Sequence, residues 1–392
     1  MDILNKIKQA GLVGRGGACF PVWQKWSAVA KAMADKSAVA SACASSDAKA
    51  LADKKASADK KALADKTIEE RKSYVICNGA EGEPGVEKDG YIIEHFPERV
   101  IDGIKIAINF LSAEKAYIYL NNKYFQKFGK KFKNLIGNSP IEFFIKPFDS
   151  GYIGGEESAI LNIIEGHRLS GASIRAEPRL RPPFPTSHGL WNAPTLINNV
   201  ETFYNVSLVA AGQFKKTRFY TISGDCPRPG VYELIDNYTI SRVLKETANL
   251  PGFNFFVQVG GSMSGEVLNA GQLKRSVAGA GSITIYSLEK NGAKKIVMDW
   301  LDFFVSESCG QCTPCREGIY RLKELACAPK IDWQLFKELV DNLTELSFCS
   351  LGCAAAVPLK SFIINVLPKI TEKKLEPAWR DQKVIVQTFK NS

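Results

Sequence analysis

Histidine is scarce, with three in 392 residues, and none of them stands at the spacing of a hydrolytic triad. No apolar run approaches the roughly 18 residues that a membrane helix needs, so we expect no membrane span. The first residues lack an apolar stretch and a small-residue cleavage site, so they predict no secretory signal. These absences argue against a histidine-dependent hydrolase, a membrane-spanning protein and a secreted protein.

The composition is that of an ordinary globular protein, with 45% hydrophobic and 23% charged residues. Lys and Arg number 51 against 41 Asp and Glu, a formal charge of +10, which suits nucleotide phosphates or an acidic protein partner. No Lys/Arg run is interleaved with aromatic residues, so we expect no nucleic-acid partner. A chain of this length predicts two or three domains.

Alternating strands and helices predict an α/β domain over residues 1–215. Within it, residues 31–66 are nearly all Ala, Lys, Asp and Ser, with one hexad in three tandem copies. A period of six keeps no face of an α-helix apolar, so we expect a low-complexity insertion without chemistry of its own. The expected strands are 74–77, 116–120 and 143–146, and the expected helices are 3–12, 97–111 and 155–166.

The rest of the chain has two different patterns. Residues 216–295 predict a small β-rich α+β module, with strands at 217–224, 230–235, 255–261 and 282–288 and a helix near 240–247. Residues 296–392 predict helices, of which 333–346 is the clearest. Cys327 lies in apolar helical sequence and is expected to be buried.

Ten cysteines are too few for a disulfide scaffold in a chain of this length, and six of them crowd into residues 309–353. Cys309, Cys312 and Cys315 stand two residues apart, which lets three thiolates wrap one inorganic cluster. Zinc prefers two C-x2-C pairs, so the pattern favours a [4Fe–4S] cluster. The spacing leaves Cys349 and Cys353 as alternatives for the fourth ligand.

Two glycine-rich segments are candidates for nucleotide binding. Gly14-Arg15-Gly16-Gly17 follows a predicted helix, and glycine N–H groups can approach a phosphate that Arg15 and Lys25 would neutralise. Residues 77–85 follow a predicted strand and combine an amide with two carboxylates, which suits a flat polar ring or a ribose. Each segment, taken alone, also fits an ordinary surface turn.

Two further polar motifs follow. Residues 151–157 open a predicted helix with paired glutamates, and acids in a first turn also complement the helix dipole. Asn198 and Asn199 are adjacent carboxamides after a proline-rich stretch, and one of them could simply cap a helix.

Taken together and in this order, the motifs resemble the flavoprotein subunit of NADH dehydrogenases, the NADH-binding subunit of respiratory complex I, with relatives in NAD-linked hydrogenases and formate dehydrogenases. The resemblance covers the chain except for 31–66. The matching stretches are GRGGACFPVWQKW (14–26), NGAEGEPGVEKD (78–89), GYIGGEESAILNIIEG (151–166), RPPFP (181–185), GLWNAPTLINNVET (189–202), ESCGQCTPCREG (307–318) and SFCSLG (347–352).

The resemblance implies FMN, NADH and one [4Fe–4S] cluster, on a Rossmann-like flavin domain, a ubiquitin-like β-grasp module at 216–295 and a C-terminal helical bundle. The FMN residues it implies are Gly14, Arg15, Gly16, Gly17, Lys25, Asn78, Glu81, Gly155, Glu156, Asn198, Asn199 and Thr202. The implied NADH residues are Phe20, Glu83, Tyr152, Glu157 and Phe184. The implied cluster ligands are Cys309, Cys312, Cys315 and Cys349.

The chain departs from the family pattern at four positions. The family's glycine before Phe20 is Cys19, and the acid after Asn78-Gly79 is Ala80. An aromatic residue is replaced by Ala28, and a lysine by Arg181. These changes motivate an alternative function, a non-catalytic electron-relay or assembly subunit that has lost NADH. A zinc-binding interaction module is the third interpretation.

The expected mechanism follows from electron counting. NADH gives up two electrons as a hydride and an iron–sulfur cluster accepts one, so a flavin must stand between them. Electrons must then leave, and the resemblance implies a thioredoxin-like [2Fe–2S] subunit and a larger catalytic subunit as partners. We expect a cytoplasmic protein that reaches a membrane only through such partners.

Overall fold

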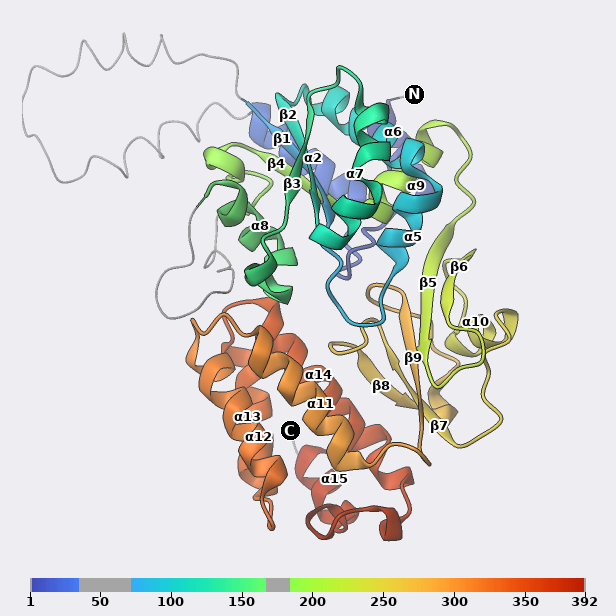
Figure 1. Cartoon of the computed structure of the whole chain (residues 1–392), viewed down its shortest axis with the longest axis vertical. Coiled ribbons are helices and arrows are strands. Elements are labelled where there is room, and N and C mark those ends of the chain that lie inside the picture. Colours follow the sequence, from blue (N-terminus) through green and yellow to red (C-terminus); the bar gives the residue numbers. More distant parts are fainter. Residues whose placement is uncertain (1, 35–71, 167–183, 391–392) are drawn as a thin grey trace, which may run out of the picture.

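The computed structural model describes residues 2–34, 72–166 and 184–390. Most of the predicted insertion, and Arg181 with it, lies outside these residues. The described residues form a parallel-sheet part (2–34, 72–166 and 184–210), a mixed-sheet part (217–287) and a helical part (293–390). In Figure 1 the parallel-sheet part lies above, with the mixed-sheet part and the helical part side by side below it.

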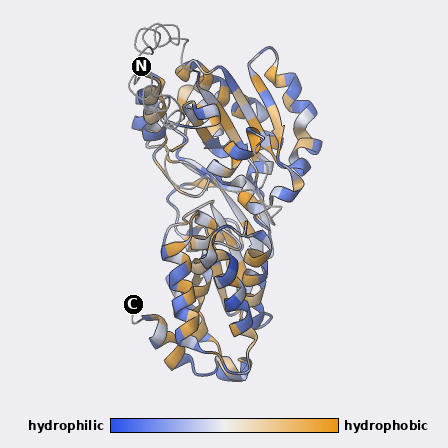
Figure 2. Cartoon of the chain, turned by 90° about the vertical axis from the view of Figure 1, so that its left-hand side faces the viewer, coloured by the Kyte–Doolittle hydropathy of each residue, from blue (hydrophilic) through white to orange (hydrophobic). Residues whose placement is uncertain are grey.

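The parallel sheet has the strand order β3-β2-β1-β4. Its strands are β1 (Tyr74–Gly79), β2 (Lys115–Leu120), β3 (Ile141–Ile145) and β4 (Thr195–Asn199), and every pairing is parallel. The inner strands are buried on both faces and stand out as hydrophobic in Figure 2. Because β2 and β4 flank β1 on opposite sides, the strand order reverses at the carboxyl ends of β1 and β4.

Helices cover this sheet. They are α1 (Ile3–Ala10), α2 (Val22–Ala34), α5 (Lys88–His95), α6 (Pro97–Leu111), α7 (Asn122–Ile136), α8 (Glu157–Ile164) and α9 (Val200–Ala210). Helix α6 begins with Pro97 at its first position, where a missing N–H does no harm, and ends at the left-handed Ser112. A Cβ on Gly103 would lie 2.0 Å from the Phe203 carbonyl oxygen, so glycine is what lets α6 pack closely against α9.

The predictions for this part were confirmed in position but were incomplete. The helix at 97–111 was predicted to the residue, and the three predicted strands correspond to β1, β2 and β3. The first helix ends at Ala10 rather than at residue 12, because Gly11 adopts a left-handed conformation there. Four helices (α2, α5, α7 and α9) and strand β4 were not predicted.

The mixed-sheet part has the strand order β6-β5-β9-β7-β8. The strands are β5 (Thr217–Gly224), β6 (Gly230–Ile235), β7 (Phe255–Val259), β8 (Glu266–Asn269) and β9 (Ser282–Ser287), with β5 and β9 parallel and the other pairs antiparallel. Helix α10 (Ile240–Glu246) buries Ile240, Val243 and Leu244 in the core of this part. Only β8 was not predicted from the sequence.

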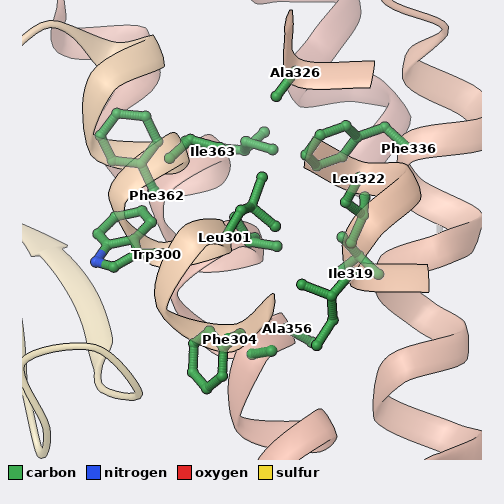
Figure 3. Close-up of a cluster of buried hydrophobic side chains, with 14 of the residues drawn as sticks. Trp300, Leu301, Phe304, Ile319, Leu322, Ala326, Phe336, Ala356, Phe362 and Ile363 are labelled. Carbon is green, nitrogen blue, oxygen red and sulfur yellow. The ribbon is translucent and has the colours of Figure 1, made fainter. Parts of the chain in front are cut away.

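The helical part contains α11 (Ala293–Glu307), α12 (Ile319–Cys327), α13 (Trp333–Leu346), α14 (Ser350–Asn365) and α15 (Gln382–Lys390). Figure 3 shows its core, where Trp300 and Leu301 of α11 and Ile363 of α14 converge with Leu322 and Phe336 from the other helices. Helix α13 was predicted at 333–346, as found. Among the described residues of the whole chain, short 3-10 turns lie at Phe148–Ser150, Tyr152–Gly155, Leu190–Asn192, Ala270–Gln272, Leu367–Lys369, Glu372–Lys374 and Pro377–Trp379, and one turn of the wider π-helix lies at Pro314–Gly318.

One segment, Ser350–Lys369, is long and apolar enough to cross a membrane, contrary to the sequence-based expectation. Length and composition are the only grounds for that reading, and 56% of its apolar window is buried inside the protein. Leu359, Phe362 and Ile363 of this segment lie in the core of the helical part. Its hydrophobicity is therefore accounted for by packing.

Candidate functional site

Polar side chains gather at the edge of the parallel sheet where the strand order reverses. Asn78 is the last but one residue of β1, Asn199 ends β4, and the two are register partners across the strand pair. In open parallel sheets, ligands bind in the crevice at this point. The predicted flavin residues from β1 and β4 therefore lie where the topology places a ligand site.

The loop Gly14–Gly17 lies on the first turn of α9. The Arg15 backbone N–H donates to the Thr202 hydroxyl over 3.0 Å, and a Cβ on Gly16 would lie 3.4 Å from the Cβ of Asn199. Among the described residues, no hydrogen bond engages the N–H groups of Gly16 and Gly17. Free N–H groups beside a helix N-terminus form a cradle that fits a phosphate.

The Arg15 side chain points elsewhere. It is 1% exposed and makes a bidentate ion pair with Asp236 of the mixed-sheet part, at 2.9 and 2.8 Å. Burial lowers the pKa of Arg15, but hydrogen bonding to Asp236 and the charge of Glu201 outweigh it, so the net shift is upward and the guanidinium stays charged. The Arg15 side chain thus joins two parts of the protein, while the loop offers its backbone to the site, and the role of Arg15 toward a phosphate stays a prediction.

Lys25, the second predicted cation, lies on α2 and pairs with Glu157, at the start of α8, over 2.5 Å. The structure thus brings together a residue implied for FMN and one implied for NADH. Ala28 follows one turn later on α2, on an exposed face.

Glu81 accepts four hydrogen bonds from within the protein, although it was predicted as a flavin contact. The backbone N–H groups of Asp89 and Gly90 donate to its carboxylate over 3.2 to 3.3 Å, and the Tyr124 hydroxyl donates over 2.6 Å. Desolvation and the nearby charge of Asp89 raise the pKa of Glu81 to about 8. The carboxyl thereby fixes the N-terminal end of α5 beside the site.

Glu83 is held by the loop between β7 and β8. Its carboxylate accepts from the N–H groups of Met263 and Ser264, at 2.8 and 2.9 Å, and from the Ser264 hydroxyl at 2.9 Å. The Ser262 hydroxyl also donates to the Pro84 carbonyl. Desolvation raises the pKa of Glu83, partly offset by these donors. Residues 83–84 therefore join the parallel-sheet part to the mixed-sheet part.

The motif at 151–157 closes the site from the side of the helical part. The Asn78 amide donates to the Gly155 carbonyl over 2.9 Å, and a Cβ on Gly155 would lie 3.2 Å from the Ala80 carbonyl. The Tyr152 N–H donates to Glu307, at the end of α11, over 2.6 Å. Glu156 caps α8 by accepting from the backbone N–H groups of Ser158 and Ala159.

The predicted aromatic residues differ in their surroundings. Phe20 is 51% and Phe184 73% exposed, whereas the Tyr152 ring packs edge-on against Phe303 at 5.4 Å. Among the described residues, no ring contact joins these three predicted NADH residues to one another. Cys19, where the family has glycine, has φ 51°, a left-handed conformation that favours glycine.

The cysteines gather in the helical part, close to the motif at 151–157. Cys309 and Cys312 follow α11, Cys315 lies in the turn before α12, and all three are buried. Burial is the main cause that raises the pKa of the Cys315 thiol to about 12, and Cys312, Cys349 and Cys309 add to it. The four thiols are thus near neighbours, three of them buried and Cys349 half-buried, and they must lose protons to bind iron.

The two candidates for the fourth ligand differ in direction. Cys349 precedes the first residue of α14, whereas the Cys353 thiol, one turn on, donates to the Thr344 carbonyl over 3.5 Å. A Cβ on Gly352 would lie 3.6 Å from the Cβ of Cys315, so the start of α14 comes close to the triplet. This arrangement supports Cys349.

The donor geometry also bears on the kind of metal. Within the described ranges, no three His, Cys, Asp or Glu side chains converge as they would on a single ion such as zinc. Four thiolates that each bind a different iron of a cubane need no such convergence. The donor set therefore fits a [4Fe–4S] cluster.

Cys327 is exposed, 3.6 Å from the Met298 sulfur, so its predicted burial was wrong.

A phosphate cradle at a parallel-sheet crevice and a largely buried four-thiol site on the same chain define a flavin- and iron–sulfur-dependent redox protein. Residues 56–208 match the Nuo51 FMN-binding domain, and residues 295–373 match the NADH-ubiquinone oxidoreductase-F iron-sulfur binding region. The chain belongs to the family of NADH-quinone oxidoreductase F subunits.

Two relatives and one solved structure illustrate the similarity. The chain is 31% identical to the NADH-quinone oxidoreductase F subunit of Buchnera aphidicola subsp. Schizaphis graminum, over 92% of this chain and 82% of that one. It is 29% identical to the protein of the same name in Aquifex aeolicus, over 90% and 82%. A chain of an NAD+-reducing [NiFe]-hydrogenase in the H2-reduced state is similar in structure, with a TM-score of 0.77 and 26% identity. That match covers 96% of this chain and 63% of the hydrogenase chain.

Sequence reasoning missed four charged or polar residues that organise the site: Lys88, Asp89, Asp236 and Glu307. Lys88 and Asp89 lie within the matched motif at 78–89, close after Glu81. Their place in that motif could have marked them as residues of the site. Asp236 and Glu307 come from distant segments, and no local pattern connects them with Arg15 or Tyr152.

Proposed function

We propose that this chain is the electron-input subunit of a multi-subunit oxidoreductase, in which it oxidises NADH and delivers electrons to partner redox subunits. The observation that supports this most strongly is that an FMN-binding domain and an iron–sulfur binding region share one chain. When bound, FMN accepts a hydride from NADH and releases electrons singly to the [4Fe–4S] cluster. The protein's own residues bind, orient and shield these groups.

The FMN phosphate is proposed to lie between the Gly14–Gly17 loop and the first turn of α9. The Gly16 and Gly17 N–H groups would donate to it, and the helix N-terminus would stabilise its charge. The rest of the FMN would be lined by the remaining implied residues, Lys25, Asn78, Glu81, Gly155, Glu156, Asn198, Asn199 and Thr202. Several of these act through backbone atoms or hold others in place, since their side chains are already paired.

NADH would approach from the side of Phe20, Glu83, Tyr152, Glu157 and Phe184. The exposed rings of Phe20 and Phe184 offer faces on which an adenine or nicotinamide can stack. The carboxylates of Glu83 and Glu157 already have partners in this structure, Met263 and Lys25 respectively. We therefore propose that they help to bind the nucleotide and repel other anions, and that they transfer no protons.

Cys309, Cys312, Cys315 and Cys349 would hold the cluster. The Ser308 hydroxyl lies 3.2 Å from the Cys315 sulfur. A hydrogen bond from this hydroxyl to the sulfur would change the reduction potential of the cluster. Glu307, next to this segment, receives the Tyr152 N–H, so the cluster segment is tied directly to the proposed nucleotide site.

We assign three domains: a Rossmann-like flavin domain over 1–215, a β-grasp module over 216–295 and a cluster-binding bundle over 296–392. The strand order β6-β5-β9-β7-β8, with β5 parallel to β9 and α10 after the second strand, supports a β-grasp topology. As partners we propose a thioredoxin-like [2Fe–2S] subunit and a larger iron–sulfur or catalytic subunit. We propose a cytoplasmic location, with any membrane contact made through such partners.

The alternative is a relay subunit that keeps flavin and cluster but has lost NADH. The exposed Ala28 in place of an aromatic residue favours it, because one stacking wall would be missing. Anaerobic mixing with NADH in a stopped-flow spectrometer separates the two. Rapid bleaching of the flavin absorbance supports the proposed function, whereas flavin that only dithionite reduces supports the relay.

A further inference from the structure

A buried lysine, Lys88, lies next to the site. Lys88, at the start of α5, is 2% exposed. Its ammonium donates to Asp89 Oδ1 over 2.6 Å and to Asn199 Oδ1 over 3.0 Å, and it lies 3.3 Å from Glu201 Oε2. Two of the three N–H groups of the ammonium are thus used by Asp89 and Asn199, and Glu201 faces the ammonium as an ion-pair partner without a hydrogen bond. Burial lowers the pKa of Lys88, but the carboxylates of Asp89 and Glu201 outweigh it and raise the pKa, so the lysine stays charged.

These contacts close a ring through Asn199. The Asn199 amide donates to Asp89 Oδ2 over 2.7 Å and to the Asn78 carbonyl over 3.3 Å. Its oxygen accepts from Lys88 and, over 3.1 Å, from the Glu201 N–H as the cap of α9. Rotating the amide by 180° would set its NH2 group against the ammonium and its oxygen against the carboxylate. The ring therefore fixes one orientation of Asn199, and every polar atom of that side chain is used within the protein.

The ring lies directly beneath the phosphate cradle. Asn199 precedes the first residue of α9, and its Cβ is the atom that a Cβ on Gly16 would approach to 3.4 Å. Thr202, in the first turn, accepts from the Arg15 N–H. Any shift of Asn199 would move the helix N-terminus relative to the glycine loop.

We propose that Lys88 is a positioning residue for the phosphate of FMN. With Asp89 it locks Asn199, which holds the glycine loop and the first turn of α9 at the separation that accepts a phosphate. It also offsets the buried carboxylates of Asp89 and Glu201, whose negative charge behind that site would oppose a phosphate. This inference rests on the proposed FMN placement and goes beyond it, because it assigns the phosphate-specific part of flavin binding to a residue that touches no flavin.

The test uses full-length, flavin-depleted protein and two probes, FMN and riboflavin, which differ only in the phosphate. Each is titrated separately by quenching of flavin fluorescence, for the wild type, Lys88→Met and Lys88→Arg. We expect Lys88→Met to weaken FMN binding by about tenfold to hundredfold, the range that corresponds to losing the charged hydrogen bond that holds Asn199, and riboflavin binding by less than about threefold. Lys88→Arg keeps the charge and should recover most of the FMN affinity.

A matched control is Lys127→Met, which removes an exposed lysine of α7 that pairs with Glu94, and it should change neither affinity. If Lys88→Met does not fold, Lys88→Gln removes the charge, keeps an N–H donor and is expected to give the same selective loss. Equal loss of FMN and riboflavin affinity, or an unchanged FMN affinity, would overturn the inference. If the wild type binds FMN but NADH does not reduce it, the proposed function fails while the role of Lys88 stands.

Discussion

The ion pair between Arg15 and Asp236 gives the sharpest prediction about stability. Asp236→Asn removes one charge from a bidentate contact at 2.9 and 2.8 Å and leaves the buried Arg15 with Glu201, whose nearest oxygen is 3.9 Å away. Removing one partner of a fully buried pair costs about 3–5 kcal/mol. The Asp236 side chain is 33% exposed, so solvent screens part of its attraction to Arg15. We therefore expect Asp236→Asn to lower the free energy of unfolding by about 2 kcal/mol.

The assay is urea unfolding followed by tryptophan fluorescence, because a loss of this size shifts the midpoint measurably. The control is Asp299→Asn, which breaks an exposed pair with Lys295 and should cost less than about 0.5 kcal/mol. The reasoning is refuted if Asp236→Asn destabilises the protein no more than this control does.

Three further predictions concern the cluster ligands, the helical core and Glu81. Cys349→Ser should abolish the EPR signal of the reduced [4Fe–4S] cluster or convert it to that of a smaller cluster, whereas Cys353→Ser should leave signal and iron content unchanged; the reverse pattern would show that the fourth ligand is misassigned. Leu301→Ala, in the core of Figure 3, should lower the free energy of unfolding by about 2–5 kcal/mol, measured in urea, since Leu301 is 1% exposed. Glu81 has a pKa raised from 4.5 to about 8, so the folded state binds its proton more tightly than the unfolded state. This contribution to stability is present below about pH 4.5 and is lost as the pH rises to 8. The free energy of unfolding of the wild type should therefore fall over this interval, and in Glu81→Gln it should fall less steeply. The same pH dependence in both proteins would contradict the raised pKa of Glu81.

Local patterns in the sequence were enough for many of the elements and for the cluster. Pro97 and the apolar periodicity after it predicted α6. The spacing of Cys309, Cys312 and Cys315 alone indicated an iron–sulfur cluster. Helix α7 was missed although Tyr124, Phe128 and Phe132 stand four residues apart, because its many lysines dominate the segment. That signal was available.

What could not be predicted depends on contacts between distant segments. Arg15 meets Asp236 across 221 positions, and Glu83 meets Ser264 across 181, so their roles as joints between parts of the protein have no local signature. The partner of the Arg15 guanidinium is therefore known only from the three-dimensional structure. Cys349 and Cys353 lie about one turn apart at the start of α14, so only the three-dimensional direction of each thiol separates them.

Electrons from NADH are expected to reach the cluster only through the flavin. Low-temperature EPR of the cluster after anaerobic addition of NADH tests this route, by comparing flavin-loaded with flavin-depleted protein of equal iron content. We expect the signal of a reduced [4Fe–4S] cluster in the loaded protein and none in the depleted protein. A cluster that NADH reduces equally without flavin, or one that stays oxidised while the flavin is bleached, would contradict the account.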